Sequence, residues 1–489
     1  MNIRFKLVSL VLAVALLAAG VGVAAAQGPS GTYGSGITCT NLDPTNSAFI
    51  QVSFYVADTG AVALSYSDPN PVPAGASRNY FTPSTPPGLP SGFIGSAVVS
   101  SDRPMACNVN TQIVGSGVGT TTNPARAGTS SGVESANAST SIFAPQVMKS
   151  LAGTYNSYMA IQNTESSPLT VFVNYVDRFG VAYPAARESF TIPGQTSHLF
   201  YQASNANLPA NFLGGATITS TGKIAGVINF YNNGASAGAT QFNSYTAFSS
   251  SANLLVAPRF VRNFYGYNGG LTIQNVGAAP TNVKVTFTFA GTPYVMNTGA
   301  IAPGATFAPY APNIAVLAPV DSLPVGSRFG SIVMQADPGG SIVAIVNEDN
   351  RGTCNAAACP AIPPEQVGFS GSYNAVPQTS ASATAFFIQV PRKAGGFFSG
   401  GFQFANTTGT ATTCNITFPS ATVANQTGVG LAANGSLSYF APNIPNLPDG
   451  FNSSVKVTCG QPIVGISNFS ARSSTYFGDS FVVANGLNQ

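Results

Sequence analysis

Few residues of this 489-residue chain could carry out chemistry, and they form no catalytic pattern. The only histidine, His198, would be needed for a serine–histidine–acid triad, but no Gly-x-Ser-x-Gly turn accompanies it. Most of the aspartates lie at predicted turns, where this residue stabilises the backbone. Residues 347–350 (Asn-Glu-Asp-Asn) offer oxygen ligands for Ca²⁺ without the spaced ladder of a dedicated loop. We expect no catalytic residue, no metal site and no cofactor, and predict that the protein is not an enzyme.

The six cysteines fit the chemistry of an oxidising compartment. A zinc site at the Cys-x4-Cys pair is the alternative, but no second cysteine pair or histidine lies nearby in the sequence. The positions of the cysteines favour three disulfides, each within one part of the chain. The predicted pairs are Cys39 with Cys107, Cys354 with Cys359, and Cys414 with Cys459.

Aromatic side chains are the remaining residues that could bind a ligand. The segment 264–267 (Phe-Tyr-Gly-Tyr) places Tyr265 and Tyr267 where they could stack on sugar rings. Sugar-binding faces usually include tryptophan, which this chain lacks. Packing of aromatic residues in the core or between modules is the alternative interpretation.

The elements that would position these residues recur through the chain. Four apolar segments end in an asparagine, and the gaps between these asparagines are 119, 118 and 121 residues. The four are Asn110, Asn229, Asn347 and Asn468. A period of this length predicts one unit copied four times. We place the repeats at residues 27–118, 141–235, 252–350 and 384–489.

Each repeat shows the pattern of an antiparallel β-sandwich. An early strand ends in asparagine every time, at Asn41, Asn163, Asn275 and Asn406. A run of alternating apolar and polar residues rich in Val, Thr and aromatics follows, as in a half-buried strand. Turn residues and a Leu-Pro pair then recur. Short strands in units of about 100 residues predict four tandem antiparallel β-sandwiches.

The repeats resemble the immunoglobulin-like sandwich modules found in tandem along bacterial secreted and cell-surface proteins. The resemblance lies in the pattern of strands and turns and extends over the chain after residue 26. The tryptophan of true immunoglobulin domains is missing. The resemblance implies the Ig-like β-sandwich fold and a place in the cell envelope, and it implies no particular function.

Stretches rich in Gly, Ser and Thr separate the repeats, and we interpret residues 115–141, 232–251 and 351–383 as linkers. An apolar strand stands before repeats two, three and four, at residues 142–148, 254–261 and 386–390. Before repeat one there is only the Gly/Ser-rich stretch 28–36. Either the first repeat is one strand short, or these strands complete the preceding repeats and the fourth is incomplete. An incomplete sandwich exposes an edge that a strand from another molecule could fill, unless the strand is dispensable.

The first 26 residues predict export. Arg4 and Lys6 precede an apolar run at residues 7–23, and three alanines follow, which is the pattern of a cleaved signal peptide. A membrane anchor is the alternative, but the run is short and lacks stop-transfer charges. We therefore expect a secreted or cell-surface protein whose mature chain has no membrane span.

Charge is sparse, at 7% of residues, and without residues 1–26 the balance is 16 basic to 15 acidic groups. Such a chain has no basic footprint for nucleic acid. Its neutral surface suits packing against copies of itself, other envelope proteins or a polymer.

We therefore expect a structural protein that self-assembles into a fibre, sheath or surface layer, or acts as an adhesin. An array of polysaccharide-binding modules is the alternative, and a hydrolase using unidentified carboxylates comes third.

Overall fold

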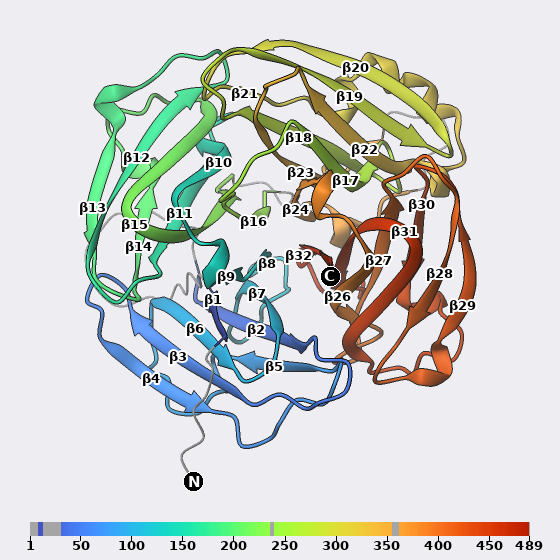
Figure 1. Cartoon of the computed structure of the whole chain (residues 1–489), viewed down its shortest axis with the longest axis horizontal. Coiled ribbons are helices and arrows are strands. Elements are labelled where there is room, and N and C mark those ends of the chain that lie inside the picture. Colours follow the sequence, from blue (N-terminus) through green and yellow to red (C-terminus); the bar gives the residue numbers. More distant parts are fainter. Residues whose placement is uncertain (1–7, 13–30, 235–238, 355–360, 489) are drawn as a thin grey trace.

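A computed structural model of the chain describes residues 8–12, 31–234, 239–354 and 361–488. The described residues form antiparallel strands joined by turns and short 3-10 helices, so the all-β class predicted from the sequence is confirmed. Figure 1 shows the strands as four groups that follow one another around a common centre. We refer to these groups as units 1 to 4 and define them by their strands.

Each unit uses its strands in the same order along the chain. Unit 1 contains β1 (Val8–Leu12), β2 (Tyr33–Asn41), β3 (Ile50–Val56), β4 (Val62–Ser67), β5 (Ser77–Phe81), β6 (Gly95–Ser101), β7 (Met105–Ile113), β8 (Ala125–Ser131), β9 (Val133–Glu134) and η1 (Ser135–Asn137). Unit 2 contains β10 (Ser139–Lys149), β11 (Tyr155–Asn163), β12 (Leu169–Asp177), η2 (Pro184–Ala186), β13 (Glu188–Ile192), β14 (Ser197–Tyr201), η3 (Gln202–Ser204), β15 (Phe212–Asn232) and β16 (Phe242–Thr246).

The second half of the chain repeats this order. Unit 3 contains β17 (Leu254–Val261), β18 (Tyr267–Asn275), β19 (Thr281–Phe289), β20 (Thr292–Ile301), β21 (Thr306–Phe307), η4 (Ala311–Asn313), η5 (Ala315–Ser322), η6 (Val325–Ser327), β22 (Phe329–Ala336), β23 (Ile342–Asn350), η7 (Pro364–Gln366), β24 (Ser370–Asn374), β25 (Val376–Pro377) and η8 (Gln378–Ser380). Unit 4 contains β26 (Ser382–Pro391), β27 (Phe398–Asn406), β28 (Thr412–Thr417), η9 (Thr422–Ala424), β29 (Gln426–Leu431), β30 (Ser436–Phe440), η10 (Ala441–Asn443), β31 (Asn452–Ala471), β32 (Gly478–Asp479), β33 (Val482–Asn485) and β34 (Leu487–Asn488).

Two sheets face each other in each unit. In unit 3 the outer sheet has the order β20-β19-β22-β17-β25 and the inner sheet the order β21-β18-β23-β24. Units 2 and 4 differ because one long strand, β15 or β31, takes part in both sheets. Alternate residues of the strands point between the sheets, as in β19, whose burial alternates along the strand. Four large core clusters among the described residues follow these units.

The asparagine that ends the early strand of each unit is a buried structural residue. The Asn163 Nδ2 donates to the carbonyl oxygens of Ser167, Ile192 and Pro193 at 2.8–3.1 Å, and its Oδ1 accepts from the Glu165 N–H. The equivalent asparagines make corresponding bonds; these are Asn41, Asn275 and Asn406. One amide thus satisfies backbone groups of two loops, which explains why the residue recurs.

Disulfides bridge neighbouring strands in units 1 and 4. Cys39 on β2 is bonded to Cys107 on β7, and Cys414 on β28 to Cys459 on β31, both pairs as predicted. Cys354 is also disulfide-bonded. Its predicted partner, Cys359, lies outside the described residues.

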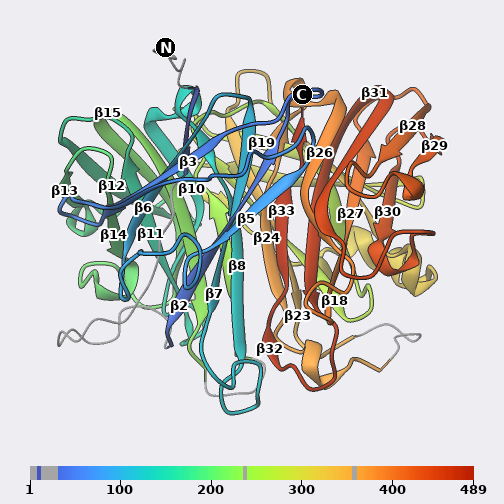
Figure 2. The same cartoon turned by 90° about the horizontal axis from the view of Figure 1, so that it is seen from below.

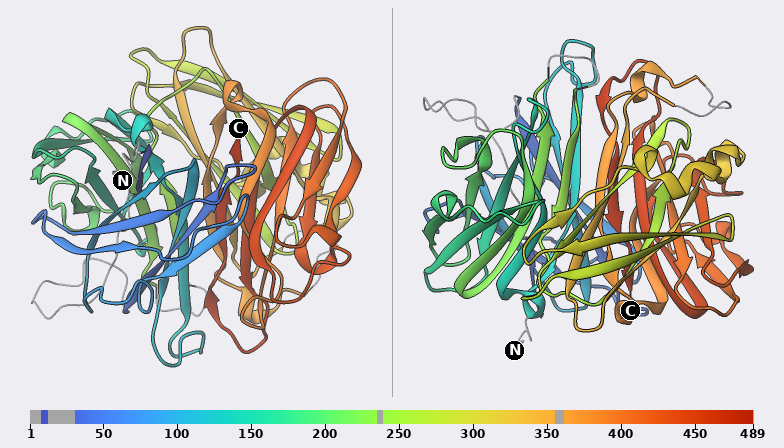
Figure 3. Two further views of the ribbon diagram at one scale, coloured as in Figure 1. Left: turned by 60° about the horizontal axis from the view of Figure 1, so that its bottom comes forward. Right: turned by 90° about the horizontal axis from the view of Figure 1, so that it is seen from above.

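The units close into a ring around four central strands. β8, β16, β24 and β33 lie side by side in that cyclic order. Figure 2 shows β8, β24 and β33 running along the axis of the ring. Units 1 and 4 meet, as Figure 3 shows, and β32 of unit 4 pairs in parallel with β8 of unit 1. The chain therefore forms one compact block and not an extended rod of modules.

The linker prediction is wrong in one respect, because β8, β16 and β24 lie inside the three Gly/Ser/Thr-rich stretches. Small residues are needed at the centre, where the strands pack closely. A Cβ at Gly128 would lie 2.6 Å from the Ser244 Oγ of the next strand, and one at Gly371 would overlap Val483.

Polar contacts tie the central strands together. Asp479 is fully buried and accepts hydrogen bonds from the Phe242 and Ser370 N–H groups, both at 2.9 Å. Burial raises the pKa of this carboxyl, although the donors oppose the shift. Since Phe242 and Ser370 belong to units 2 and 3, one side chain of unit 4 joins three units.

The strands at residues 142–148, 254–261 and 386–390 belong to the units that follow them, because β10, β17 and β26 pair with β15, β22 and β31. In unit 1 the same place is taken by β1, which lies within the predicted signal peptide. β1 pairs with β6 from Val8↔Ser101 to Leu12↔Ala97 and with β9. Of the stretch 28–36, residues 33–36 belong to β2, and residues 28–30 lie outside the described residues.

Candidate functional site: a cleft between units 3 and 4

A cleft of about 820 Å³ lies between unit 3 and unit 4 and contains both tyrosines singled out from the sequence. Unit 3 contributes Tyr265 and Tyr267. Unit 4 contributes Phe440, Arg472 and a rim of exposed polar groups that includes Asn443. The cleft is thus lined by aromatic faces and by amide and guanidinium donors.

Tyr265 is held at the rim by the hairpin between β17 and β18. Its backbone has φ 50°, and Asn263 and Gly266 on the same hairpin also have positive φ. The corresponding hairpins of units 2 and 4 place Ala152 and Gly395 at the same position, with φ 50° and 58°. The hairpin conformation is therefore common to these three units, whereas the exposed ring, at 46% of its surface, belongs to unit 3 alone.

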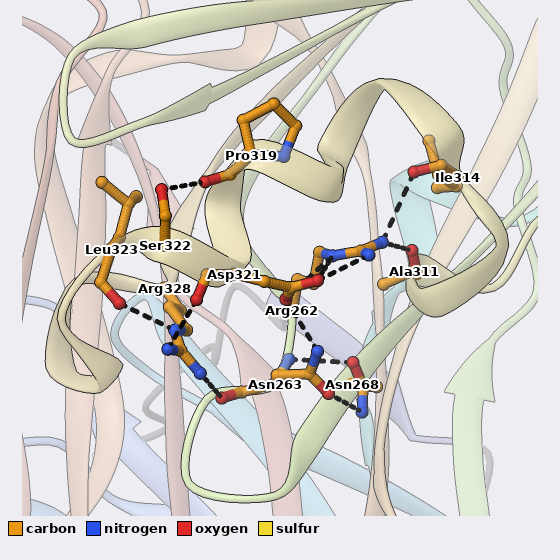
Figure 4. Close-up of polar contacts among 10 residues, drawn as sticks. All are labelled: Arg262, Asn263, Asn268, Ala311, Ile314, Pro319, Asp321, Ser322, Leu323 and Arg328. Carbon is orange, nitrogen blue, oxygen red and sulfur yellow. Dashed lines mark hydrogen bonds and ion pairs between the residues drawn. The ribbon is translucent and has the colours of Figure 1, made fainter. Parts of the chain in front are cut away.

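A polar network supports the base of this hairpin (Figure 4). The Arg262 guanidinium is buried and binds the Asp321 carboxylate, with Nη2 2.8 Å from Oδ2. Asn263 Nδ2 donates to the other oxygen of Asp321 at 2.7 Å, and Arg262 also donates to the Ala311 carbonyl. The 3-10 region from η4 to η5 is thereby fixed to the hairpin.

A second buried arginine completes the network from the other side. Arg328 donates to the carbonyl oxygens of Leu323, Asp321 and Asn263, at 2.9, 2.8 and 3.3 Å. Arginine suits this role because its planar head presents several donors in fixed directions. The hairpin that carries Tyr265 is therefore rigidly placed.

The floor of the cleft is a buried ion pair. Arg259 Nε and Nη2 each donate to a carboxylate oxygen of Glu348 at 2.6 Å, and Nη1 donates to Gln403 Oε1 of unit 4 at 3.0 Å. Burial alone would lower the pKa of Arg259, but the facing carboxylate outweighs it, so the pKa is raised. Glu348 is thus held in an ion pair.

Tyr267 lies deeper than expected for a stacking residue. It is 6% exposed and packs against Phe481 with ring centroids 5.5 Å apart, as part of the unit 3 core. Burial raises the pKa of its phenol, and its hydroxyl has no hydrogen-bond partner. Its ring is therefore not available for stacking, and its hydroxyl is buried as well.

Unit 4 supplies the second exposed aromatic face. Phe440 at the end of β30 is 37% exposed, and the Arg472 guanidinium carbon lies 5.3 Å from the centre of its ring. Val423 nearby is 72% exposed. Tyr265 and Phe440 thus border one cleft from opposite units, with polar groups between them.

Such an arrangement can bind a ligand that has both apolar faces and hydroxyl groups. Aromatic rings take up the apolar faces, and asparagine and arginine groups meet the hydroxyls. Sequence reasoning found the tyrosines but missed Phe440 and Arg472, since neither lies in a recognisable motif. The only signal was an aromatic residue at the end of a short strand.

The other candidate residues have structural partners. His198 lies on β14, with Nδ1 2.7 Å from the Asp58 carboxylate of unit 1, and its ring stacks on Phe190 at 3.6 Å. In residues 347–350 the acids separate, because Glu348 binds Arg259 while Asp349 binds Tyr310 and Arg351. Within the described ranges no three acidic, cysteine or histidine side chains gather as metal ligands. No helix in that part of the chain is long and apolar enough to cross a membrane.

Comparisons with known proteins add little. No family model matches the chain, and no curated protein matches it. A crystal structure from Thermotoga maritima, of protein 1070, is 14% identical over 26% of this chain and 94% of that one, with a TM-score of 0.18. The pilus backbone of Streptococcus pneumoniae is 10% identical over 78% of this chain and 86% of that one, with a TM-score of 0.12. Similarities this weak carry no argument about function.

Proposed function

We propose that the chain is a non-enzymatic structural protein of the cell exterior, secreted or surface-bound, which associates with copies of itself or with other envelope proteins. The observation that carries this proposal is the closed ring of units. Its interfaces use residues that would otherwise be candidates for chemistry: His198 bonds Asp58 across units 1 and 2, and Arg259 bonds Gln403 across units 3 and 4. The disulfides support an oxidising compartment.

Self-association through the outer edge of unit 3 is the form of assembly that the strands favour. β20 ends its sheet, is ten residues long and carries no charged residue. Charges, proline and bulges protect natural edge strands, and here Pro293 and a shift in register lie near the two ends of β20 and leave its middle unprotected. Val295 in its middle is 43% exposed. An uncharged edge of this length is suited to pairing with a strand of another molecule.

Electron microscopy of the purified exported protein tests this proposal. We expect ordered polymers without added ligand, and we expect Val295→Lys to abolish them while leaving the melting temperature unchanged. Val181→Lys is the matched control, because Val181 is 53% exposed but lies outside the described strands. Protein that stays monomeric at high concentration, or polymers that survive Val295→Lys, would contradict assembly through this edge.

Binding of a polysaccharide in the cleft is the second candidate function, supported by Tyr265 and Phe440 on its two walls. The test is retention of the protein on an insoluble glycan. Tyr265→Ala is expected to reduce retention at least tenfold without altering the fold, since Ala152 occupies the same backbone conformation in unit 2. For the buried Tyr267 the appropriate change is Tyr267→Phe, which removes only the unpartnered hydroxyl. Equal retention of the Tyr265→Ala variant would exclude the cleft as the binding site.

A further inference from the structure

The first strand of unit 1 differs in origin from its equivalents. β10, β17 and β26 are continuous with the units they complete. β1 is separated from β2 by twenty residues and lies within the apolar segment that predicts export. Removal of residues 1–26 would therefore leave β6 paired with β3 on one side and open on the other. Two of the core residues on β6, Ala97 and Val99, are fully buried in the described structure, and their strand would become an edge of the sheet.

The three equivalent strands each carry a long polar side chain that bonds the following unit. Gln146 on β10 accepts a hydrogen bond from Asn347 Nδ2 of unit 3 at 2.6 Å. Gln389 on β26 accepts one from Asn110 Nδ2 of unit 1 at 3.1 Å. In each case the first strand of one unit bonds the recurring asparagine of the next unit around the ring. Arg259 occupies the corresponding place on β17.

Asn229 is the member of this asparagine set that faces unit 1. It is 1% exposed, and its Oδ1 accepts from Ser244 Oγ at 2.6 Å. Its Nδ2 has no hydrogen-bond partner. By the order of the ring, an acceptor equivalent to Gln146 and Gln389, which bond the asparagines of units 3 and 1, would come from the first strand of unit 1. Residues 7–23 contain one polar side chain, Ser9, and no side-chain carbonyl or carboxylate.

We propose that, once residues 1–26 are removed, an extended segment of a partner polypeptide occupies the place between β6 and β9. The segment has alternating apolar residues that cover the unit 1 core, and a glutamine-like side chain whose oxygen accepts from Asn229 Nδ2. Main-chain pairing supplies the affinity and this side chain the specificity. The inference rests on the export within the proposed function, and it does not depend on assembly through β20.

A second copy of the chain is not the occupant. Its strands with the required pattern are already paired, β10 with β15 and β26 with β31, and so are β33 and β34 near the end of the chain. Donation of any of them would open an equal gap in the donor. A different envelope polypeptide therefore has to supply the strand.

The test uses the exported protein and a peptide with the sequence of residues 139–149, which contains Gln146. Intact mass first establishes whether the exported chain starts after residue 26. The fluorescent peptide is then titrated against the protein. We expect saturable binding, weakened about tenfold when the peptide carries Gln146→Leu, because a buried amide then stays unbonded. The Asn229→Ala protein is expected to bind both peptides alike.

Three results would overturn the inference. They are an exported chain that retains residues 8–12, a chain without them that does not bind the peptide, or equal binding of the original peptide and the peptide with Gln146→Leu. Protein produced inside the cell with residues 1–26 intact and then oxidised is the matched control, and it should not bind. Electron microscopy reports separately on assembly through β20. If the protein forms polymers but does not bind the peptide, this inference is refuted and the proposed assembly is not.

Discussion

The buried ion pair at the floor of the cleft gives the sharpest test of how units 3 and 4 are joined. Glu348→Gln preserves the shape of the side chain but leaves the Arg259 charge uncompensated. Arg259 is 5% exposed and makes two bonds of 2.6 Å to the carboxylate. Breaking one partner of such a pair costs about 3–5 kcal/mol. Since one oxygen of the glutamine amide can still accept, we expect a loss near the lower end, about 3 kcal/mol.

The repeat itself suggests how to recover this loss. Units 2 and 4 carry Gln146 and Gln389 where unit 3 carries Arg259, so glutamine fits this place in the ring. Arg259→Gln alone should also destabilise the protein, because it leaves the Glu348 carboxylate buried and unpaired. The double variant removes both charges, and we expect it to be at least 2 kcal/mol more stable than the sum of the single losses.

Amide hydrogen exchange along β17 and β23 is the appropriate assay, because it reports local free energies of opening in a chain of several units. Asp449→Asn serves as the control; Asp449 is more than half exposed and binds Lys393 at 2.7 Å and Arg392 at 2.9 Å, and we expect a loss below about 1 kcal/mol. Two results would refute the view that this ion pair is desolvated and coupled. One is a double variant whose loss of stability equals the sum of the two single losses, and the other is a Glu348→Gln loss as small as that of Asp449→Asn.

Three further predictions concern stability and titration. Asn163 is buried, and Asn163→Asp removes the donors to three carbonyl oxygens, so it should lower the free energy of unfolding by about 3 kcal/mol. Asn174→Asp on the exposed side of β12 should change it by less than about 0.5 kcal/mol, as measured by chemical denaturation. Replacing Cys39 and Cys107 together by serine opens a loop of 68 residues and should cost about 4 kcal/mol by chain-entropy arguments; an unchanged denaturation midpoint would contradict this. The N–H groups of Thr45 and Asn46 lower the pKa of Asp43 to about 2. The ionised carboxylate therefore contributes its full stabilisation above about pH 4, and this contribution is lost as the pH falls towards 2. An NMR titration that gives Asp43 an ordinary pKa near 4 would refute these hydrogen bonds.

Local features of this fold can be predicted from the sequence because they depend on neighbouring residues. The asparagine of each early strand marks a real strand end, since it bonds the loop that begins two residues later. The pairings Cys39–Cys107 and Cys414–Cys459 follow from their places in the repeat. The count of units and the boundaries given from the sequence stay predictions.

The ring could not be predicted, because its contacts join residues more than a hundred positions apart through small polar groups. Ser131 and Thr246, for example, bond each other across units 1 and 2, and neither belongs to an apolar period. The same composition that resembles a linker is required where four strands meet. The cleft itself was not predicted. Of the two tyrosines singled out from the sequence, Tyr265 is exposed and Tyr267 is buried, and Phe440 comes from another unit.

Closure of the ring has a consequence for how the protein reaches its final form. β32 and β33 complete the centre, yet they follow almost all of the other strands in the chain. A polypeptide synthesised and translocated from its amino end must keep the facing surfaces of β8 and β24 uncovered until residues 478–485 arrive. We therefore expect the nascent protein to depend on a chaperone during this interval, and a truncation before residue 478 to leave early units folded but prone to aggregate.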